Sequence, residues 1–194
     1  MRTLNGDGLV LMTAKRPRAE ISLPQRCARI AMLVLDVDGV MTDGRIVYTD
    51  QGAEVKAFHV RDGSGLKLWM TLGKKAGIIT GRRSLIVERR AQELGITAVI
   101  QGADDKKAAL VQMTAALGVP LDEVCGMGDD LVDVPLLRAC GLAVAVADAC
   151  AEAKEEADYV TQARGGRGAV REVIELILRA QGSWQTIVAR YRKD

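Results

Sequence analysis

The sequence predicts an α/β protein built on a doubly wound, Rossmann-like parallel sheet. From Ala31 onward, short continuous apolar runs alternate with amphipathic stretches, and each run ends in a small or acidic residue. Unbroken apolar runs are typical of strands that are buried on both faces, and parallel strands need long crossovers that are usually helical. The alternation therefore predicts an open parallel sheet with helices on both of its faces.

Six apolar runs are the predicted strands, and in chain order they span residues 32–35, 76–79, 98–100, 124–127, 142–146 and, more weakly, 159–160. The predicted helices are the amphipathic stretches at 62–74, 84–94, 104–117, 131–139, 150–156 and 168–180. Because crossovers between parallel strands are right-handed, this order of elements gives a doubly wound sheet.

One segment departs from the alternation. Within residues 44–60, two runs of alternating polarity, 45–48 and 54–58, flank Asp50-Gln51-Gly52. Such a pair of runs around a turn sequence predicts a β-hairpin inserted after the first strand. No other insertion is long enough for a separate cap domain, so we expect the site to be open or covered by another subunit.

The chain length of 194 residues fits one compact domain. Residues 1–25 contain two prolines and a basic cluster without sustained periodicity, which predicts a flexible N-terminal extension. The folded domain is expected to span residues 26–182. Residues 183–194 are expected to form a C-terminal tail that carries no chemistry.

The composition favours a small ligand over a nucleic acid or a membrane. Aromatic residues make up 3% of the chain, and the net charge of +2 comes from interspersed charges, so a basic, base-stacking surface is not expected. No apolar run reaches the roughly 20 residues of a membrane span. The four cysteines have no paired spacing, which predicts reduced thiols and a cytoplasmic protein.

Polar side chains follow four of the predicted strands. They are Asp36 and Asp38 after the first strand, Thr80, Gly81 and Arg82 after the second, Lys106 after the third, and Asp129 and Asp130 after the fourth. Ligands of open parallel sheets bind at the carboxyl ends of the strands, so these residues are expected to share one edge. Taken singly, each of these residues is also explained as a loop residue, a helix cap or a solvated lysine. The prediction depends on the order of the four groups, each of which follows its own strand.

This set of side chains suits phosphoryl transfer assisted by Mg²⁺. Clustered carboxylates repel one another unless a hard cation is present, and Asp36 and Asp129 would supply its ligands. An aspartate can then attack phosphorus to form an aspartyl-phosphate, while a carboxyl two residues along protonates the leaving alkoxide. Lys106 and Thr80 would hold the phosphoryl oxygens.

The four motifs resemble those of the haloacid dehalogenase superfamily. They are Asp36-Val37-Asp38-Gly39-Val40, Ile79-Thr80-Gly81-Arg82, Lys106, and Gly128-Asp129-Asp130-Leu131-Val132-Asp133. Three further segments and the hairpin resemble the capless branch that acts on 3-deoxy-D-manno-octulosonate 8-phosphate: Thr42-Asp43-Gly44, Arg61-Asp62-Gly63 and the Gly-Gly-Arg-Gly-Ala-Val-Arg-Glu run at 165–172. The resemblance covers residues 28–182.

The resemblance implies a capless, Mg²⁺-dependent phosphatase. It would release inorganic phosphate from that eight-carbon sugar acid phosphate, as a step of lipopolysaccharide precursor synthesis in the cytoplasm. Asp36 would be the nucleophile and Asp38 the acid/base. The side chains of Asp36 and Asp129 and the backbone carbonyl of Asp38 would bind Mg²⁺.

The resemblance also implies a homotetramer whose hairpins build a central barrel, with a neighbour's C-terminal segment over the site. Residues 165–168 would be the flexible covering segment, or else a plain loop before the last predicted helix. Arg167 from this run could meet the carboxylate of the sugar.

Substrate contacts are expected from Thr80, Gly81, Arg82, His59, Arg61 and Arg167. His59, the one histidine of the chain, would contact a substrate hydroxyl, or it is a partly exposed strand residue. Arg61 has the same two interpretations.

Three alternatives share parts of this pattern. A phosphatase for a nine-carbon sugar acid 9-phosphate has the same chemistry, but that branch resembles this chain less at residue 82, where it tends to have Glu. A non-catalytic phosphatase-like oligomerisation module can lose the acid/base carboxyl, whereas Asp38 and Lys106 are both present. A phosphoacceptor signalling domain would leave Asp38 and the hairpin unexplained.

Overall fold

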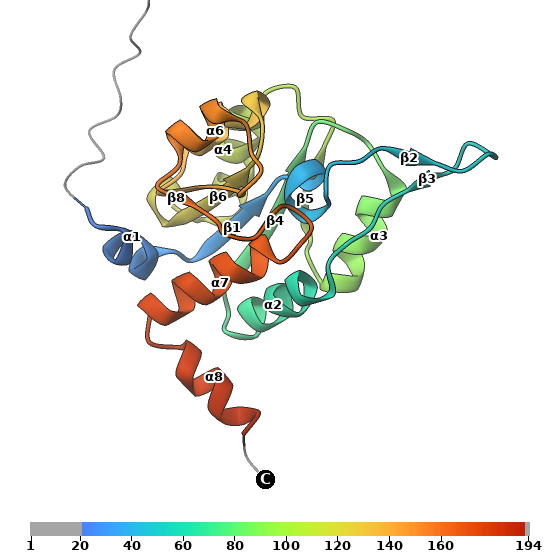
Figure 1. Ribbon diagram of the computed structural model, residues 1–194. Coiled ribbons are helices and arrows are strands. Elements are labelled where there is room, and N and C mark those ends of the chain that lie inside the picture. Colours follow the sequence, from blue (N-terminus) through green and yellow to red (C-terminus); the bar gives the residue numbers. More distant parts are fainter. Residues whose placement is uncertain (1–20, 193–194) are drawn as a thin grey trace, which may run out of the picture.

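Six parallel strands form the centre of the protein, in the order β5-β4-β1-β6-β7-β8 (Figure 1). The computed structural model describes residues 21–192. The strands are β1 (Met32–Leu35), β4 (Lys75–Thr80), β5 (Ala98–Gln101), β6 (Val124–Gly128), β7 (Leu142–Ala145) and β8 (Tyr159–Val160). They match the six predicted runs, and the doubly wound parallel sheet predicted from the sequence is confirmed.

Burial on both faces explains the composition of the central strands. Every residue of β1 is fully buried. In register, Val34 lies between Gly77 of β4 and Gly126 of β6. A strand without a solvent face gains most from continuous aliphatic side chains, which is why β1 reads Met-Leu-Val-Leu.

Two layers of helices cover the sheet. One layer contains α1 (Leu23–Arg29), α2 (Val60–Thr71) and α7 (Ala169–Ala180), and the other contains α4 (Lys106–Leu117), α5 (Val134–Ala139) and α6 (Ala151–Glu156) (Figure 1). The helix α3 (Leu85–Leu94) packs beside α2. Three short helical turns complete the elements: η1 (Val37–Met41), η2 (Leu121–Glu123) and η3 (Leu131–Asp133).

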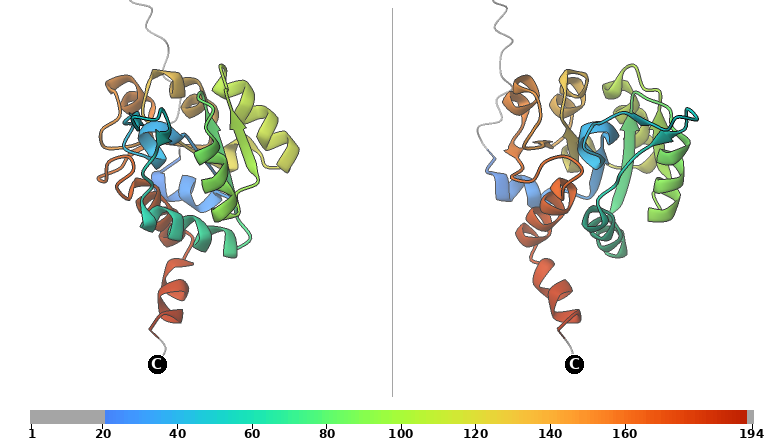
Figure 2. Two further views of the ribbon diagram at one scale, coloured as in Figure 1. Left: turned by 90° about the vertical axis from the view of Figure 1, so that its right-hand side faces the viewer. Right: turned by 45° about the vertical axis from the view of Figure 1, so that its right-hand side comes forward.

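The inserted hairpin consists of β2 (Val47–Tyr48) and β3 (Glu54–Val55), which pair antiparallel. It extends away from the sheet rather than over it, as Figure 2 shows from two further sides. The predicted insertion of residues 44–60 is therefore a hairpin, with strands shorter than the alternating runs. Nothing among residues 21–192 forms a separate cap domain.

Both predicted ends of the domain lie inside helices or next to them. The helix α1 begins at Leu23, so the expected boundary at residue 25 falls within it. The extension predicted for residues 1–25 otherwise lies outside the described residues. At the other end, α8 (Trp184–Arg190) buries Trp184 and Ile187 against the core. The folded domain thus continues past residue 182, because two large apolar side chains of the expected tail pack on it.

No helix within residues 21–192 is long and apolar enough to span a membrane.

Candidate active site

The carboxyl ends of β1, β4 and β6 bring three of the predicted residues to one edge of the sheet. Asp36 directly follows β1, Thr80 ends β4 and Asp129 follows β6. Since β1 lies between β4 and β6, Asp36 occupies the middle of the edge. The side chains of Asp36 and Thr80 are almost completely buried.

A buried ion-pair network connects Asp36 to α4. Lys106 is the first residue of α4, whose first turn is capped by the carboxylate of Asp105. The Lys106 ammonium donates to Asp36 Oδ1 at 2.7 Å and to Asp133 Oδ1. Burial alone would lower the pKa of Lys106, but the charges of Asp36 and Asp133 raise it above its ordinary value. The ammonium therefore stays charged beside Asp36.

Asp133 links Lys106 to the loop after β6. It is fully buried, and its Oδ2 accepts the backbone N–H groups of Asp129 at 2.9 Å and of Asp130 at 3.2 Å. This carboxylate therefore fixes both the ammonium and the loop that carries Asp129. The sequence pattern alone indicated no separate role for Asp133, although this residue ends the fourth motif. Asp133 lies three residues after Asp130, which is the spacing of a capping box at the start of η3. This spacing was the sequence signal that could have indicated a structural role for Asp133.

Gly39 lets the two acidic loops approach each other. Its φ of +105° lies in the region that glycine favours. A Cβ at this position would lie 2.0 Å from Asp129 Oδ2. Any side chain at residue 39 would therefore push the loop after β6 away from the turn that contains Asp38.

Burial and neighbouring negative charges raise the pKa values of Asp36 and Asp129. Burial, followed by the charge of Asp133, raises the pKa of Asp36 to about 6, although Lys106 opposes the shift. Burial, followed by the charges of Asp36 and Asp133, raises the pKa of Asp129 to about 7. Near neutral pH these carboxyls thus compete for protons, as expected of a site with an excess of negative charge.

The donor set fits a hard divalent cation. Among residues 21–192, one carboxylate oxygen from each of Asp36, Asp129 and Asp133 lies within 4.8 Å of the others. Three carboxylates and the Lys106 ammonium leave two negative charges when ionised, which a divalent cation would cancel. Asp133 is already bound by Lys106 and two amides, so Asp36 and Asp129 are the side chains that would hold Mg²⁺.

Mg²⁺ is expected to raise the melting temperature, and to raise it more at pH 8 than at pH 5.5. The folded-state pKa values of Asp36 (about 6) and Asp129 (about 7) exceed the ordinary 3.8. Without metal, the folded state then binds more protons than the unfolded chain between pH 4 and 7, and the free energy of unfolding falls as pH rises through this window. The cation binds the deprotonated form, so its stabilisation grows over the same window.

At about 100 times its Kd, Mg²⁺ would add about 2.7 kcal/mol, which corresponds to about 5–10 °C for a chain of this size. Thermal unfolding with Mg²⁺ or chelator at the two pH values measures this. Asp129→Asn is the matched variant, in which the shift should shrink. A shift in the native protein that is equal at both pH values would contradict the prediction.

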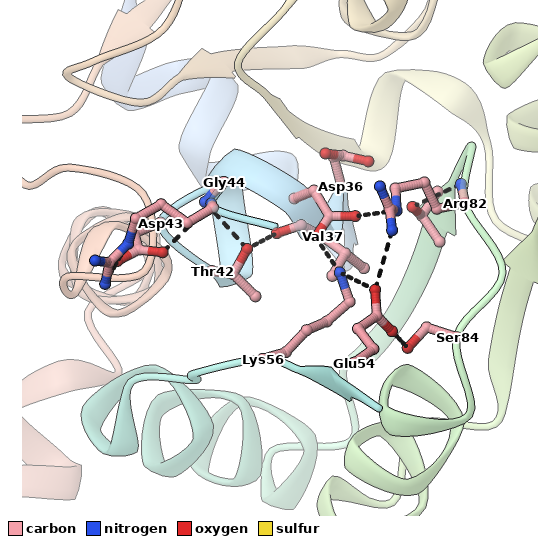
Figure 3. Close-up of polar contacts among 12 residues, drawn as sticks. Asp36, Val37, Thr42, Asp43, Gly44, Glu54, Lys56, Arg82 and Ser84 are labelled. Atoms are coloured by element: carbon pink, nitrogen blue, oxygen red, sulfur yellow. Dashed lines mark hydrogen bonds and ion pairs between the residues drawn. The ribbon is translucent and has the colours of Figure 1, made fainter. Parts of the chain in front are cut away.

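Asp38 lies in a second charged group, formed with the hairpin and the loop after β4. Figure 3 shows three other members of this group, Glu54, Lys56 and Arg82. Lys56 donates to Asp38 Oδ1, and Arg82 Nε lies 3.7 Å from Asp38 Oδ2. Glu54 binds the same two cations: its Oε1 lies 3.4 Å from Lys56 Nζ and accepts from Arg82 Nη2 at 3.1 Å. Two positive and two negative side chains thus balance one another beside Asp36.

Thr80 and Gly81 complete the edge between Asp36 and Arg82. The Thr80 hydroxyl oxygen accepts the backbone N–H of Arg82 at 3.4 Å. Gly81 is exposed, so its backbone is open to a ligand at the end of β4.

The other predicted substrate residues lie elsewhere, around the beginnings of α2 and α7. His59 is the N-cap of α2 and not a strand residue; its Nδ1 lies 3.9 Å from Asp62 Oδ2. Arg61 and Arg167 line a shallow pocket of about 280 Å³ beside α7. Arg167 Nη2 also lies 3.5 Å from Asp43 Oδ2.

The segment 165–168 is packed against its own chain, so the expectation of a flexible covering segment is corrected. The Gly165 N–H donates to Asp148 Oδ1 and the Gly166 N–H donates to the Val40 carbonyl, both at 2.9 Å. A Cβ on Gly165 would lie 1.6 Å from the Gly39 carbonyl oxygen. The two glycines allow the backbone to lie directly on the turn after β1, which the sequence pattern could not reveal.

Glu54 and Lys56 were also missed from the sequence. The alternating run 54–58 predicts only that both belong to the hairpin; in the structure Lys56 also contacts Asp38, and Glu54 contacts Lys56. The available signal was their spacing of two, because residues two apart in a strand point to the same face. A face with one acidic and one basic residue next to the apolar Val55 indicates a polar environment on that side.

Three features define the class of protein as a capless haloacid dehalogenase-like hydrolase. They are the parallel sheet, the acidic centre at its carboxyl edge and the absence of a cap domain within residues 21–192. A family model for haloacid dehalogenase-like hydrolases matches residues 84–174. The 3-deoxy-D-manno-octulosonate 8-phosphate phosphatase of Yersinia pestis is 50% identical over 157 residues, which are 81% of this chain and 84% of that protein. Its counterpart in Escherichia coli K12 is 46% identical over the same shares of the two chains.

Solved structures agree with the relatives. The phosphatase of the same name from Moraxella catarrhalis, solved with magnesium, phosphate and the sugar acid, superposes with a TM-score of 0.85 at 44% identity over 87% of this chain and 97% of that chain. The cobalt-bound enzyme of Haemophilus influenzae gives a TM-score of 0.79 at 40% identity over 81% of this chain and 92% of that chain. The chain therefore belongs to the family of 3-deoxy-D-manno-octulosonate 8-phosphate phosphatases.

Proposed function

We propose that this chain hydrolyses 3-deoxy-D-manno-octulosonate 8-phosphate to the free sugar acid and inorganic phosphate through an aspartyl-phosphate on Asp36. The observation that carries the proposal is the buried arrangement of Asp36 against Lys106, with Asp129 beside it and Asp38 two residues along. It offers a nucleophile, a fixed cation for the phosphate, a place for a metal and an acid/base. The identity of the substrate is inferred from the relatives, which are named as phosphatases of 3-deoxy-D-manno-octulosonate 8-phosphate.

In the first step, a carboxylate oxygen of Asp36 attacks phosphorus, and the bond from phosphorus to the sugar oxygen breaks. Asp38 gives its proton to the departing alkoxide. In the second step, water attacks the phosphorus of the aspartyl-phosphate, Asp38 takes a proton from it, and inorganic phosphate leaves. Asp36 is then a carboxylate again, and Asp38 is again protonated.

Mg²⁺, held by the carboxylates of Asp36 and Asp129 and by the backbone carbonyl of Asp38, would supply charge neutralisation for the dianionic phosphate. Lys106 would hold a phosphoryl oxygen through the ammonium that contacts Asp36. Thr80 and Gly81 would bind the other oxygens from the end of β4.

The sugar acid would be bound beyond the phosphate. The support for Arg82 in this role is that its side chain lies beside Asp38 and is 39% exposed. His59, Arg61 and Arg167 would reach the sugar only if the substrate, or a neighbouring subunit, extends to the start of α7.

Phosphate release from a panel of substrates tests the proposal. The panel contains the eight-carbon sugar acid 8-phosphate, a nine-carbon sugar acid 9-phosphate, and a simple hexose 6-phosphate. We expect the highest kcat/KM for the eight-carbon substrate and no turnover in chelator. A higher value for the nine-carbon substrate would overturn the substrate assignment, and no turnover of any of the three with Mg²⁺ would overturn the enzyme.

Arg82→Ala is expected to lower kcat/KM for the eight-carbon substrate by about ten- to hundredfold. A charge-assisted contact between Arg82 and the sugar carboxylate is worth roughly 1.5–3 kcal/mol. A phosphate ester without a carboxylate, such as glycerol phosphate, should lose much less. Equal losses on both substrates would assign Arg82 to the phosphate, to the orientation of Asp38 or to the fold, and the carboxylate role would pass to Arg167 or Arg61.

We also propose a homotetramer assembled through the hairpins, with a neighbouring subunit over the open site. Its support is the apolar surface of the hairpin, where Ile46 is 56% and Tyr48 is 59% exposed. A two-stranded hairpin cannot bury such side chains by itself. Light scattering at micromolar concentration should give four times the chain mass of 20.8 kDa. A monomer would contradict the assembly.

The compartment proposed is the cytoplasm, where the product would enter lipopolysaccharide synthesis. Its support is that all four cysteines lie in the described part of the chain and none forms a disulfide.

A further inference from the structure

The hairpin turns one polar face toward the site. Glu54 begins β3 and Lys56 directly follows that strand; their charged ends lie 3.4 Å apart, from Lys56 Nζ to Glu54 Oε1, whereas the intervening Val55 is 43% exposed. Figure 3 shows Glu54 and Lys56 reaching from the hairpin toward the end of β4 and the turn after β1. The hairpin therefore contributes to the site within the same subunit, besides any part it has in assembly.

Lys56 is held in place more completely than a surface lysine. Its side chain is 2% exposed, and its ammonium donates to Asp38 Oδ1 while lying 3.4 Å from Glu54 Oε1. The other oxygen of Asp38 has Arg82 Nε at 3.7 Å. Both oxygens of the Asp38 carboxyl are thus directed by cations, one from the hairpin and one from the loop after β4.

Glu54 fixes the two cations relative to each other. Its Oε1 accepts from Arg82 Nη2, and its Oε2 accepts from the Ser84 hydroxyl at 2.5 Å. That hydrogen bond is the main cause that lowers the pKa of Glu54, with Lys56 and Arg82 contributing, so Glu54 stays charged. Ser84 is the N-cap residue of α3, yet its side chain makes no capping bond there. The hydroxyl serves Glu54 instead of the helix.

Stability alone does not explain a buried lysine in this place. Removing an ammonium and a carboxylate from water costs about as much as their attraction returns, and apolar replacements of buried ion pairs are often neutral or stabilising. The orientation of the partner group is what such a pair can determine. Here the partner is Asp38, the group that must reach first the departing sugar oxygen and then the attacking water.

We propose that Lys56, which follows the hairpin strand β3, is a positioning residue that orients the Asp38 carboxyl for the reaction. Glu54 binds both Lys56 and Arg82 and so fixes the positions of these two cations beside Asp38. The inference rests on the proposed function, since it needs Asp38 as the acid/base. The Asp38 carboxyl has a hydrogen bond to Lys56 on one oxygen and an ion-pair partner, Arg82, beside the other, which restricts its rotation and favours one approach to the leaving oxygen before substrate binds. The charged partners of Lys56 in this arrangement are Asp38 and Glu54.

The test compares two substrates in Lys56→Met, which keeps the apolar stem and removes the ammonium. The sugar phosphate leaves as an alkoxide and needs a proton, whereas 4-nitrophenyl phosphate leaves as a stable phenolate and does not. Because general acid/base catalysis contributes about 10²–10⁴-fold, kcat for the sugar phosphate should fall about 10–100-fold when Asp38 is misoriented.

Rapid mixing with 4-nitrophenyl phosphate gives the decisive signal. Formation of the aspartyl-phosphate should stay within about threefold of the native rate, because this step needs no proton from Asp38. Hydrolysis of the intermediate still needs Asp38 as base and should be slow. We therefore expect a burst of nitrophenolate equal to the number of sites, followed by slow turnover. The native enzyme should show a smaller burst or none.

Two further variants keep the test sharp. Lys67→Met is the matched control, since Lys67 is exposed on α2, and its rates should equal those of the native enzyme. Glu54→Gln loosens Lys56 and Arg82 without removing either, and should show the same pattern with a loss of about 3–10-fold. If Lys56→Met fails to fold, Glu54→Gln carries the test alone. Circular dichroism and light scattering establish that each variant keeps its fold and assembly.

Equal losses on both substrates without a burst would overturn the positioning role and leave Lys56 a structural ion pair. Unchanged rates on both would overturn it as well. Asp38→Asn separates this failure from a failure of the proposed function. If Asp38→Asn shows the burst and Lys56→Met does not, only the role of Lys56 is lost; if Asp38→Asn turns over like the native enzyme, the proposed function is lost first.

Discussion

Asp36→Asn is expected to abolish turnover, with a loss of about 10⁴-fold or more in kcat, the range seen when a covalent nucleophile is removed. The amide is a poor nucleophile and carries no charge for the cation. The change also leaves the Lys106 ammonium, 2.7 Å from Asp36 Oδ1 in the native site, with Asp133 as its one remaining carboxylate partner in this network. Phosphate release with the sugar phosphate at saturating Mg²⁺ measures the loss.

The control for Asp36→Asn is Asp122→Asn, an exposed carboxyl in η2 before β6, at the opposite edge of the sheet. Its activity should equal that of the native enzyme. Activity of Asp36→Asn above roughly one per cent of wild type would remove Asp36 from the nucleophile role, given the size of the expected loss.

Asp38→Asn is expected to lower kcat for the sugar phosphate by about 10²–10⁴-fold, the usual contribution of a general acid/base. Both the leaving alkoxide and the attacking water lose their proton partner. Binding of Mg²⁺ should persist, because Asp38 is proposed to contribute its backbone carbonyl and not its side chain. The Mg²⁺-induced rise in melting temperature should therefore stay close to that of the native protein while turnover is lost.

The two readouts for Asp38→Asn can disagree in an informative way. Turnover of the sugar phosphate within about threefold of native would exclude Asp38 as the acid/base. Loss of the Mg²⁺-induced shift together with turnover would place the side chain of Asp38 in metal binding instead. Asp129→Asn provides the comparison, because both readouts should fall together there.

Much of the architecture followed from the sequence because burial dictates composition. The apolar runs of the central strands are unbroken because both faces of these strands are buried, and the site residues come directly after or at the end of such runs, where the chain turns at the edge of the sheet. Parallel strands all end at one edge, so the order of Asp36, Thr80, Lys106 and Asp129 was enough to predict a common site. The short hairpin strands were also predicted, from alternation around a turn sequence.

The ends of the domain were less predictable. Trp184 and Ile187 become buried because α8 packs against α7. Seven-residue helices carry too little periodicity to identify from sequence. The same holds for α1, which begins before the expected boundary.

The sequence by itself determined the order of elements, the edge at which the site lies and the residue types that react there. Local composition encodes these, since each depends on a short run of residues and its immediate successor. Only the tertiary structure decided that Asp133 fixes Lys106, that Gly165 lies on the turn after β1, and that Lys56 reaches Asp38. Each of these contacts joins residues that are 18 to 126 positions apart or depends on where a turn points, and no periodicity in a single sequence records such distances.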